Sequence, residues 1–118
     1  MTDVKKLFIN TLKPFGYKII LQGSMAAEEK YPDNFFTFFN NSADSQEFYD
    51  NEEKSIIWDF DLNFYSNKVT ITNSILLEAK KKLKEAGFIV NGKGYDVASD
   101  QSSHIGRGIN VLYIEREE

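Results

Sequence analysis

Cysteine is absent from this sequence of 118 residues, histidine occurs once and proline occurs twice. The lack of cysteine excludes disulfide bonds, thiolate metal sites and cysteine nucleophiles. A single histidine argues against a zinc site, because such sites combine several histidine, cysteine or carboxylate ligands. Much of the chemistry that small enzymes commonly use is therefore closed to this chain.

Long apolar runs and an excess of positive charge are also missing. No run approaches the roughly 20 residues that a membrane helix needs, and the opening MTDVKKLFINTLKPFG lacks the apolar centre of a secretory signal. The net charge is −4, whereas a protein that grips nucleic acid needs a basic surface. We therefore expect that the protein is made in the cytoplasm, that it does not associate with a membrane and that binding nucleic acid is not its main role.

Aromatic residues are abundant, with ten phenylalanines and six tyrosines. A hydrophobic share of 42% in 118 residues is enough for one real core, so we predict a single domain over residues 1–118. So many aromatic side chains exceed what one small core uses. The surplus predicts an apolar surface that meets a partner.

The segment from Ser55 to Ser66, SIIWDFDLNFYS, alternates apolar and mostly polar residues without a break. Side chains of a strand point to opposite faces with a period of two. The even positions therefore predict a buried face, and the odd positions, which include Asp59 and Asp61, predict a polar one. A strand this long needs neighbours on both sides, so we place it at the centre of a sheet.

Apolar residues at helical spacing predict two helices, at about residues 3–13 and 70–86. The predicted caps are Thr2, followed by Asp3, for the first helix, Thr70 or Thr72 for the second, and Gly87 at its end. Other apolar segments predict strands. The five predicted strands are Tyr17–Gln22, Phe35–Asn41, Ser55–Ser66, Phe88–Val97 and Gly108–Glu115.

These elements predict an α+β fold, a mostly antiparallel sheet of about five strands with two helices packed on one face. In the second strand Phe35 and Phe39 fall on one face, and Phe36 and Phe38 on the other. A strand that is apolar on both faces is covered on both faces. Because two helices cannot cover both sides, we expect a long loop or another protein chain on the second side.

Three glycine-rich or polar segments connect these elements. Gly92 and Gly94 predict a bulge or bend inside the fourth strand. The segments 98–107 and 42–54 are predicted to be loops, the second of them acidic. A calcium loop is not favoured for 42–54, because the spacing of an EF-hand is absent.

Few residues have the pattern of a chemical site. Asp59 and Asp61 share a face, as paired carboxylates in acid–base or metal sites do, but the polar face of a sheet or a subunit contact is the favoured interpretation. His104 has Ser103 and Asp100 nearby in sequence, yet triads normally assemble from separate elements. We predict no catalytic residue, no cofactor and no metal, and keep a small hydrolase or phosphate-binding enzyme around His104 as a disfavoured alternative.

The second helix carries the run Lys80, Lys81, Lys82 and Lys84. A solvated helix face is the favoured interpretation, because no exposed aromatic residues are interleaved with the lysines. A nucleic-acid-binding module that uses this helix is the alternative, and it predicts salt-dependent binding.

Three runs carry a resemblance to a known family: YPDNFFTFFNN, FYDNEEKSIIWDFDLNFYSN and LLEAKKKLKEAGFIVNGKGYDVASDQSSHIGRGINVLYIERE. They are similar to small proteins encoded among the head–tail connection genes of tailed bacteriophages and prophages of Gram-positive bacteria. The match is to tail completion or tail-to-head joining proteins, with tail terminators as relatives. It covers residues 31–117, and its specific parts are the W-D-F-D strand and the G-K-G-Y-D-V-A-S-D…H-x-G-R-G-I-N hairpin.

The resemblance implies a structural virion protein rather than an enzyme, and it brings no catalytic residues. It implies an α+β subunit in a ring, usually a hexamer, at the head–tail junction of the virion, although the isolated protein can be a monomer. The implied partners are other copies of the chain, the tail tube protein and the head connector. DNA passes through such a ring without specific binding, and an adaptor or stopper of the connector is the neighbouring alternative.

The bare faces of the second and last strands are the candidate assembly surface, because a ring needs two different surfaces on each subunit. We expect segments 42–54 and 98–107 to reach neighbouring subunits. The residues predicted for the assembly interface are Phe35, Phe39, Asp59, Asp61, Tyr95, His104 and Arg107.

Overall fold

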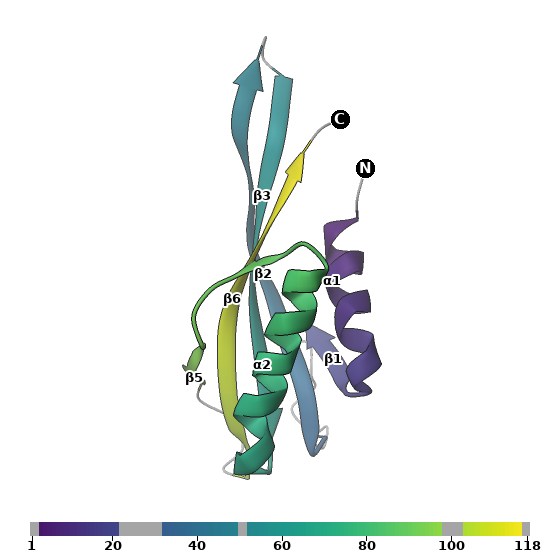
Figure 1. The fold of residues 1–118 in the computed structure, drawn as a ribbon, viewed down its shortest axis with the longest axis vertical. Coiled ribbons are helices and arrows are strands. Elements are labelled where there is room, and N and C mark those ends of the chain that lie inside the picture. The colour runs from purple at the N-terminus through teal and green to yellow at the C-terminus, as the bar shows by residue number, and fades with distance from the viewer. Residues whose placement is uncertain (1–2, 22–31, 50–51, 98–102, 117–118) are drawn as a thin grey trace.

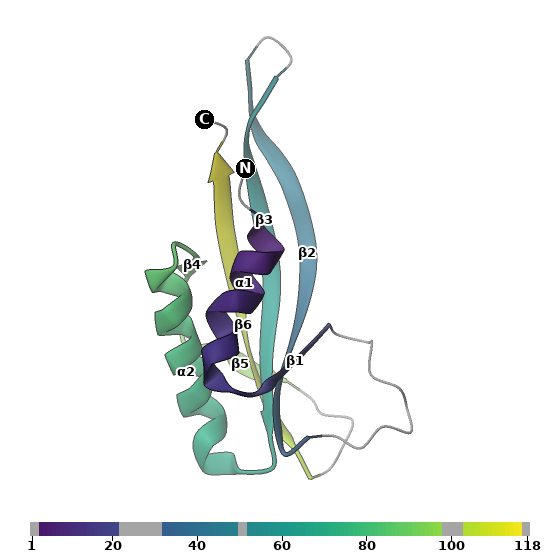
Figure 2. The ribbon, with the colours of Figure 1, turned by 90° about the vertical axis from the view of Figure 1, so that its right-hand side faces the viewer.

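The strand predicted to be central lies in the middle of a six-stranded sheet in the computed structural model, which describes residues 3–21, 32–49, 52–97 and 103–116. This strand, β3 (Glu52–Ser66), pairs antiparallel with β2 (Asn34–Tyr49) on one side and with β6 (Ile105–Arg116) on the other. Both helices lie on the same side of the sheet (Figures 1 and 2). The predicted α+β class is confirmed.

The sheet is mixed, with the order β1-β2-β3-β6-β4, and β5 also pairs with β6. Strand β1 (Lys18–Leu21) runs parallel to β2, while every other described pairing is antiparallel. The predicted strand 88–97 is divided into β4 (Ile89–Val90) and β5 (Tyr95–Val97). This division gives six strands where about five were predicted.

The break between β4 and β5 follows from a change of register along β6. Val90 pairs with Val111 and Tyr95 pairs with Gly108, so the four residues 91–94 stand opposite only two. The predicted bend is thus confirmed, and Gly92 and Gly94 have positive φ angles of 79° and 86° there.

Helix α1 (Val4–Leu12) begins at Asp3, whose side chain accepts a hydrogen bond from the Lys6 backbone N–H at 3.1 Å. Asp3 is therefore the N-cap, whereas Thr2 lies outside the described residues. The helix passes into a short 3₁₀ turn at Lys13–Phe15. Pro14 lies within that turn, and Gly16 ends it with a φ of 80°.

Helix α2 (Val69–Glu85) starts one residue earlier than predicted. The predicted threonine caps are wrong, because Lys68 occupies the N-cap position and its N–H donates to Ser66 Oγ at 3.0 Å. Thr72 lies inside the helix and donates its hydroxyl to the Lys68 carbonyl. Gly87 ends the helix as predicted, with a φ of 102°. Among the described residues, neither helix has the length and apolar character that crossing a membrane requires.

The core lies between the helices and one face of the sheet, and aromatic rings dominate it. Phe8 of α1 stacks on Phe60 of β3 with centroids 4.8 Å apart, and it meets Phe88 edge-on at 5.8 Å. Phe36 and Phe64 pack together at 4.9 Å. All five rings are buried, and fully burying a side chain of this size contributes about 1.5–3 kcal/mol. This face supplies most of the stability of the fold.

The prediction of a loop over residues 42–54 is wrong. Strand β2 continues to Tyr49 and β3 begins at Glu52, with register shifts between Asn40 and Ser42 and between Ser45 and Phe48. Pairing between β2 and β3 overrides the polar composition of this segment. We call residues 42–54 the acidic arm. Its side chains from Asp44 to Lys54 lie outside the described residues.

The acidic arm carries the sheet well beyond the helices (Figures 1 and 2). Ser55 pairs with Arg116 at the described end of β6, so only β2 and β3 continue past that point in the described part of the chain. The molecule measures 54 × 28 × 23 Å, with the strands along the longest dimension. The two helices therefore cover only part of the sheet.

Candidate functional surface: the open face of the sheet

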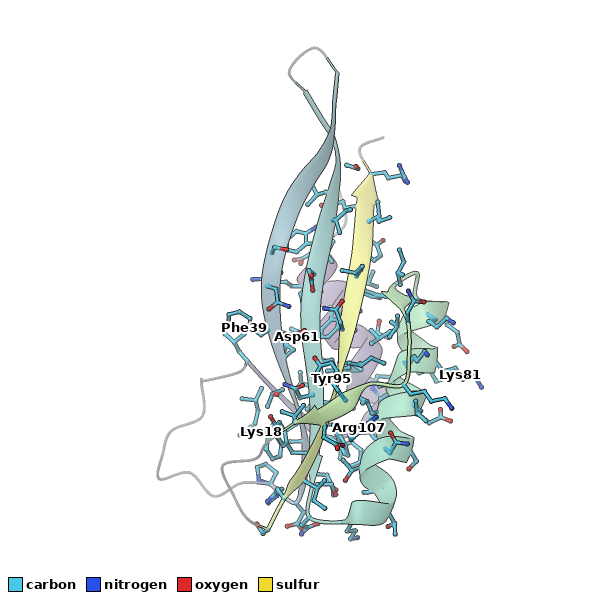
Figure 3. The ribbon with its side chains drawn as sticks, turned by 90° about the vertical axis from the view of Figure 1, so that its left-hand side faces the viewer. Lys18, Phe39, Asp61, Lys81, Tyr95 and Arg107 are labelled. Atoms are coloured by element: carbon cyan, nitrogen blue, oxygen red, sulfur yellow. The ribbon has the colours of Figure 1, made fainter. Side chains whose placement is uncertain are left out.

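The face of the sheet that points away from the helices is the candidate functional surface, and we call it the open face (Figure 3). Strand register fixes its members, because directly paired residues share a face. From β2, β3 and β6 it carries Phe35, Thr37, Phe39, Asn41, Ile57, Asp59, Asp61, Asn63, Tyr65, Gly106, Gly108, Asn110, Leu112 and Ile114. The odd positions of β3 thus form the polar row that the alternation predicts.

A network of amides and carboxylates lies at the middle of the open face. Asn110 Nδ2 donates to Asp59 Oδ1 at 2.6 Å and lies 3.3 Å from Asp61 Oδ1. Asn41 Nδ2 donates to the same Asp59 oxygen at 3.2 Å. These amide hydrogens offset the repulsion between two carboxylates that are next neighbours on one face. Asp59 and Asp61 are therefore structurally satisfied rather than poised as an isolated pair.

Tyr95 extends this network from β5. Its hydroxyl hydrogen-bonds with the Asp61 carboxylate, and 45% of the residue remains exposed. Burial is the first cause that raises the pKa of Tyr95 above its ordinary value of 10.0, followed by the negative charge of Asp61 and this hydrogen bond, with a smaller effect of Asp59. The Tyr95 hydroxyl therefore stays protonated and bound to Asp61 at neutral pH.

Two glycines of β6 allow β5 to lie this close to the open face. A Cβ atom on Gly108 would overlap Asn63 Oδ1 and lie 2.8 Å from Tyr95 Cε2. A Cβ atom on Gly106 would lie 2.6 Å from Tyr65 Cε1. Such distances are far below ordinary van der Waals contact. We call Gly106 and Gly108 the glycine bed, because their lack of a side chain leaves the space that the rings of Tyr65 and Tyr95 occupy.

Phe35 and His104 lie at the end of this face. Phe35 stacks on Tyr65 at 5.2 Å and is only 3% exposed, so the prediction that it is bare is wrong. Its ring lies 5.9 Å from that of His104. His104 Nε2 is 2.8 Å from the Pro32 carbonyl, so it carries the proton, and Nδ1 accepts from Ser103 Oγ at 2.9 Å. Asp100, the third member of the imagined triad, lies outside the described residues.

Arg107 is the one predicted interface residue that the structure does not bring to the open face. It pairs in register with Phe64, whose ring is in the core, so it belongs to the helix side of β6. Its guanidinium donates to Asp96 Oδ1 at 2.9 Å and to the Lys93 carbonyl at 2.8 Å. Arg107 thus holds the β4–β5 segment in place (Figure 3).

Apolar side chains also remain accessible on the open face. Phe39, opposite Asp61 in register, is 46% exposed. Ile57, Leu112 and Ile114 are half-buried on the same face, further along the strands toward the acidic arm. A surface that mixes exposed aromatic and aliphatic groups with ordered polar groups is typical of a protein interface.

The described residues do not assemble a recognisable metal centre. In the part of the chain that the structure describes, no three carboxylate or histidine side chains lie close enough to hold a metal ion. Asp59 and Asp61 are two such groups, and their neighbours on this face are amides and a tyrosine.

No protein-family model matches the chain, and a search of curated proteins found no match.

Sequence reasoning found the two aspartates, Phe39 and Tyr95, but it missed Asn110 and Asn41. The two-residue period of β6 indicates that Asn110 shares a face with Gly108 and Leu112, and the pairing with β3 sets it opposite Asp61. Asn41 had no such signal, since a register shift between Asn40 and Ser42 brings it to Asp59. The role of Gly106 and Gly108 could not be predicted without knowing that β5 pairs with β6 at these glycines.

Proposed function

We propose that this chain is a structural protein of the phage virion that forms a ring at the head–tail junction, where it completes the tail and joins it to the head connector. The observation that carries the proposal is the extension of the sheet beyond its two helices, together with the sequence resemblance described above. A subunit with an uncovered sheet has a surface that another protein can cover.

The acidic arm supports assembly for a physical reason. An isolated two-stranded ribbon is marginally stable in water, and the outer edge of β2 past Phe39 is not covered by β1, which pairs only with Phe35–Phe38. Exposed strand edges are sites at which chains meet. Contacts with a neighbouring subunit would stabilise both the ribbon and its edge.

The open face supports the same proposal. Phe39 and Tyr95 are nearly half exposed, beside the ordered carboxylates Asp59 and Asp61. Apolar anchors surrounded by satisfied polar groups favour binding to a protein surface. The proposed partners are other copies of the chain, the tail tube protein and the head connector, and DNA would pass through the ring repelled by the negative charge of the chain.

The test is the mass in solution across protein concentration, by light scattering after size exclusion, with negative-stain images of any large species. In a second experiment, the protein is added to an extract that contains phage heads and tails but lacks this chain. Rings with a central hole, or completed tails, are the expected results. A chain that forms no ring and completes no tail would contradict the proposal.

A nucleic-acid-binding module is the second candidate, because the structure adds Lys93 to the lysines of α2. Lys80 Nζ donates to the carbonyl of Gly92, which brings Lys93 next to the helix. Phosphate binding by such a patch would weaken steeply with salt. A mobility shift of duplex or single-stranded DNA at low salt that disappears at high salt would favour this candidate, and no shift at low salt would remove it.

A further inference from the structure

Two edges of the sheet have no neighbouring strand among the described residues. Strand β1 pairs with β2 only as far as Phe38, and β4 pairs with β6 at Val111 and Leu112. In the described part of the chain, no strand therefore borders the outer side of β2 over residues 39–49 or of β6 over residues 113–115. Such an edge presents a row of backbone N–H and C=O groups, and a further strand is the partner that matches the whole row.

Four consecutive rungs of the sheet bring these two edges to the same level. At each rung a residue of β3 pairs with β2 on one side and with β6 on the other, and no register shift falls between the rungs. In the order β2, β3 and β6, the rungs are Ser42, Asp59 and Leu112; Ala43, Trp58 and Tyr113; Asp44, Ile57 and Ile114; and Ser45, Ile56 and Glu115. The edge of β2 at residues 43–45 is therefore level with the edge of β6 at residues 113–115, on the opposite side of β3 (Figure 2).

The two edge strands also run in the same direction. Both β2 and β6 are antiparallel to β3, and their arrowheads point to the same end of the molecule (Figure 1). If β6 of one copy lies beside β2 of the next, the sheet continues with a parallel pair and every copy points the same way. Because the two edges are level, each copy can follow the last without a shift along the strands. A contact between two different surfaces closes into a ring only when it repeats without such a shift.

We infer that the edge of β6 at residues 113–115 in one copy of this chain pairs with the edge of β2 at residues 43–45 in a second copy. This inference rests on the proposed function, since it names the two strands through which the copies of a ring would meet. Each copy has one edge of each kind, as a ring of identical subunits requires. The three-stranded part of the sheet would then continue from one subunit to the next.

Pairing between two β2 edges is the competing arrangement, and it would give a closed dimer instead of a ring. It would bring two copies of segment 42–54 side by side, and each copy of that segment contains five acidic residues and one basic residue. Like charges on paired strands are destabilising. Residues 113–115 of β6 contain a single charged residue, Glu115. The edge of β6 is therefore the better neighbour for the edge of β2.

Cross-linking between single cysteines tests which edges meet, because the chain has no cysteine of its own. Ala43 is exposed, and register places it on the helix side of the sheet together with Glu115. In the inferred pairing, Glu115 of one copy is the diagonal neighbour of Ala43 of the next, at about 8 Å. A mixture of Ala43→Cys chains and Glu115→Cys chains should therefore be joined by a short bifunctional thiol reagent. Glu115 is substituted rather than Tyr113, whose ring packs on Phe88.

The matched control is Ile105→Cys, at an exposed position at the other end of β6. It should not be joined to Ala43→Cys, and Ala43→Cys chains alone should not be joined to one another. The reagent is applied to the assembly that the wild type forms, either rings in solution or completed tails. A yield with Glu115→Cys no higher than with Ile105→Cys would overturn the inference. So would a yield between two Ala43→Cys chains as high as with Glu115→Cys, which would assign the β2 edge to a dimer.

Proline substitution tests the same contact at the backbone. Neighbouring residues of an edge strand direct their N–H groups alternately toward the sheet and away from it. Of Ala43→Pro and Asp44→Pro, one therefore removes a hydrogen bond to β3, and the other removes only an outward N–H. The second variant should keep the wild-type circular dichroism spectrum and weaken self-association about tenfold or more, measured by sedimentation velocity. Two folded proline variants that assemble as the wild type does would overturn the inference, and if neither variant folds the cross-linking yields decide.

The outcomes separate this inference from the proposed function. If the wild-type chain forms rings or completes tails while the cross-linking yields overturn the strand pairing, the proposed function stands and other surfaces join the copies. If the wild-type chain neither forms rings nor completes tails, the proposed function and the strand pairing are both overturned.

Discussion

The two faces of the sheet are built from alternate residues of the same strands, yet they differ in almost every physical respect. On the helix face Phe60 and its neighbours are completely buried among aromatic rings. On the open face Asp59 and Asp61, one position away on either side, are held by amide donors and remain partly accessible. The two faces of β3 thus have different roles: residues on one face stabilise the fold, and residues on the other are available to a partner.

This contrast also explains why a large net charge is tolerated next to a compact core. The amides and carboxylates at the middle of the open face contact one another, on the side of the sheet opposite to the aromatic core. Substitutions of exposed side chains on this face should therefore lower the free energy of unfolding less than substitutions of buried side chains on the helix face.

The largest effect is expected for Phe60→Ala. Removing a fully buried ring that stacks on Phe8 should lower the free energy of unfolding by about 3–5 kcal/mol. The matched open-face change is Phe39→Ala, in a ring that is 46% exposed, and it should cost less than about 1 kcal/mol. Urea denaturation measures both, with Phe60→Leu as a milder variant. Equal costs for Phe60→Ala and Phe39→Ala would break the comparison between the faces.

A smaller loss is expected for Gly108→Ala, the open-face position with the least space. Its Cβ would collide with Asn63 and approach Tyr95 at 2.8 Å, so β5 must shift at a cost of about 1–3 kcal/mol. Ile105→Ala, at an exposed position on the same strand, is the control and should change little. Thermal unfolding followed by circular dichroism compares them. A Gly108→Ala protein as stable as the wild type would show that the glycine bed is not needed.

Asn110→Ala should destabilise the protein by about 1–2 kcal/mol, because Asp59 and Asp61 lose their shared donor. Added salt screens the repulsion that is left. The loss should therefore shrink between low and high salt, and Asp59→Asn in the same chain should recover part of it. A loss of the same size at all salt concentrations would mean that Asn110 acts through packing alone.

The smallest effect concerns Tyr95. Asp61→Asn should lower the pKa of Tyr95 toward its ordinary value of 10.0, since it removes the nearby charge and changes the hydrogen bond. Ultraviolet titration of the phenolate measures this, with Tyr95→Phe to identify the signal among six tyrosines.

The same raised pKa links stability to pH. A raised pKa in the folded state contributes stability that is present below the unfolded value of about 10 and is lost as the pH rises through the folded value. The wild type should thus lose stability more steeply than Tyr95→Phe above pH 10. Parallel alkaline profiles for the two proteins would contradict the hydrogen bond to Asp61.

Sequence periodicity predicted the helix face well because burial there follows from the spacing of apolar residues. The alternation around Phe60 and the helical stripe that includes Leu76 and Leu83 both led to the correct faces. The end of α2 was also predictable, because Gly87 provides the left-handed conformation that follows the helix.

The acidic arm was missed for an equally specific reason. Its composition is that of a loop, and its strand pairing comes from β3, the partner across the hairpin. The start of α2 was missed because the N-cap position is occupied by Lys68, whose side chain makes no capping hydrogen bond, so the usual capping residue types do not mark it. The position of Arg107 follows from the alternation of side chains along β6, which places it on the helix side. The predicted strand began only at Gly108, so the sequence prediction did not apply this alternation to Arg107.

The register of the hairpin has a consequence for how the protein acquires its structure. Tyr49 and Glu52 pair across two residues, whereas Ser66 and Ile105, the nearest pair of β3 and β6 in sequence, are 39 positions apart. Closing a short loop costs less chain entropy and takes less time than closing a long one. We expect pulse-labelled hydrogen exchange to find the β2–β3 pairing protected before the β3–β6 pairing. The ribbon that the helices leave uncovered would then be the first part of the sheet to form, so a newly made chain would expose the ribbon before its core is complete.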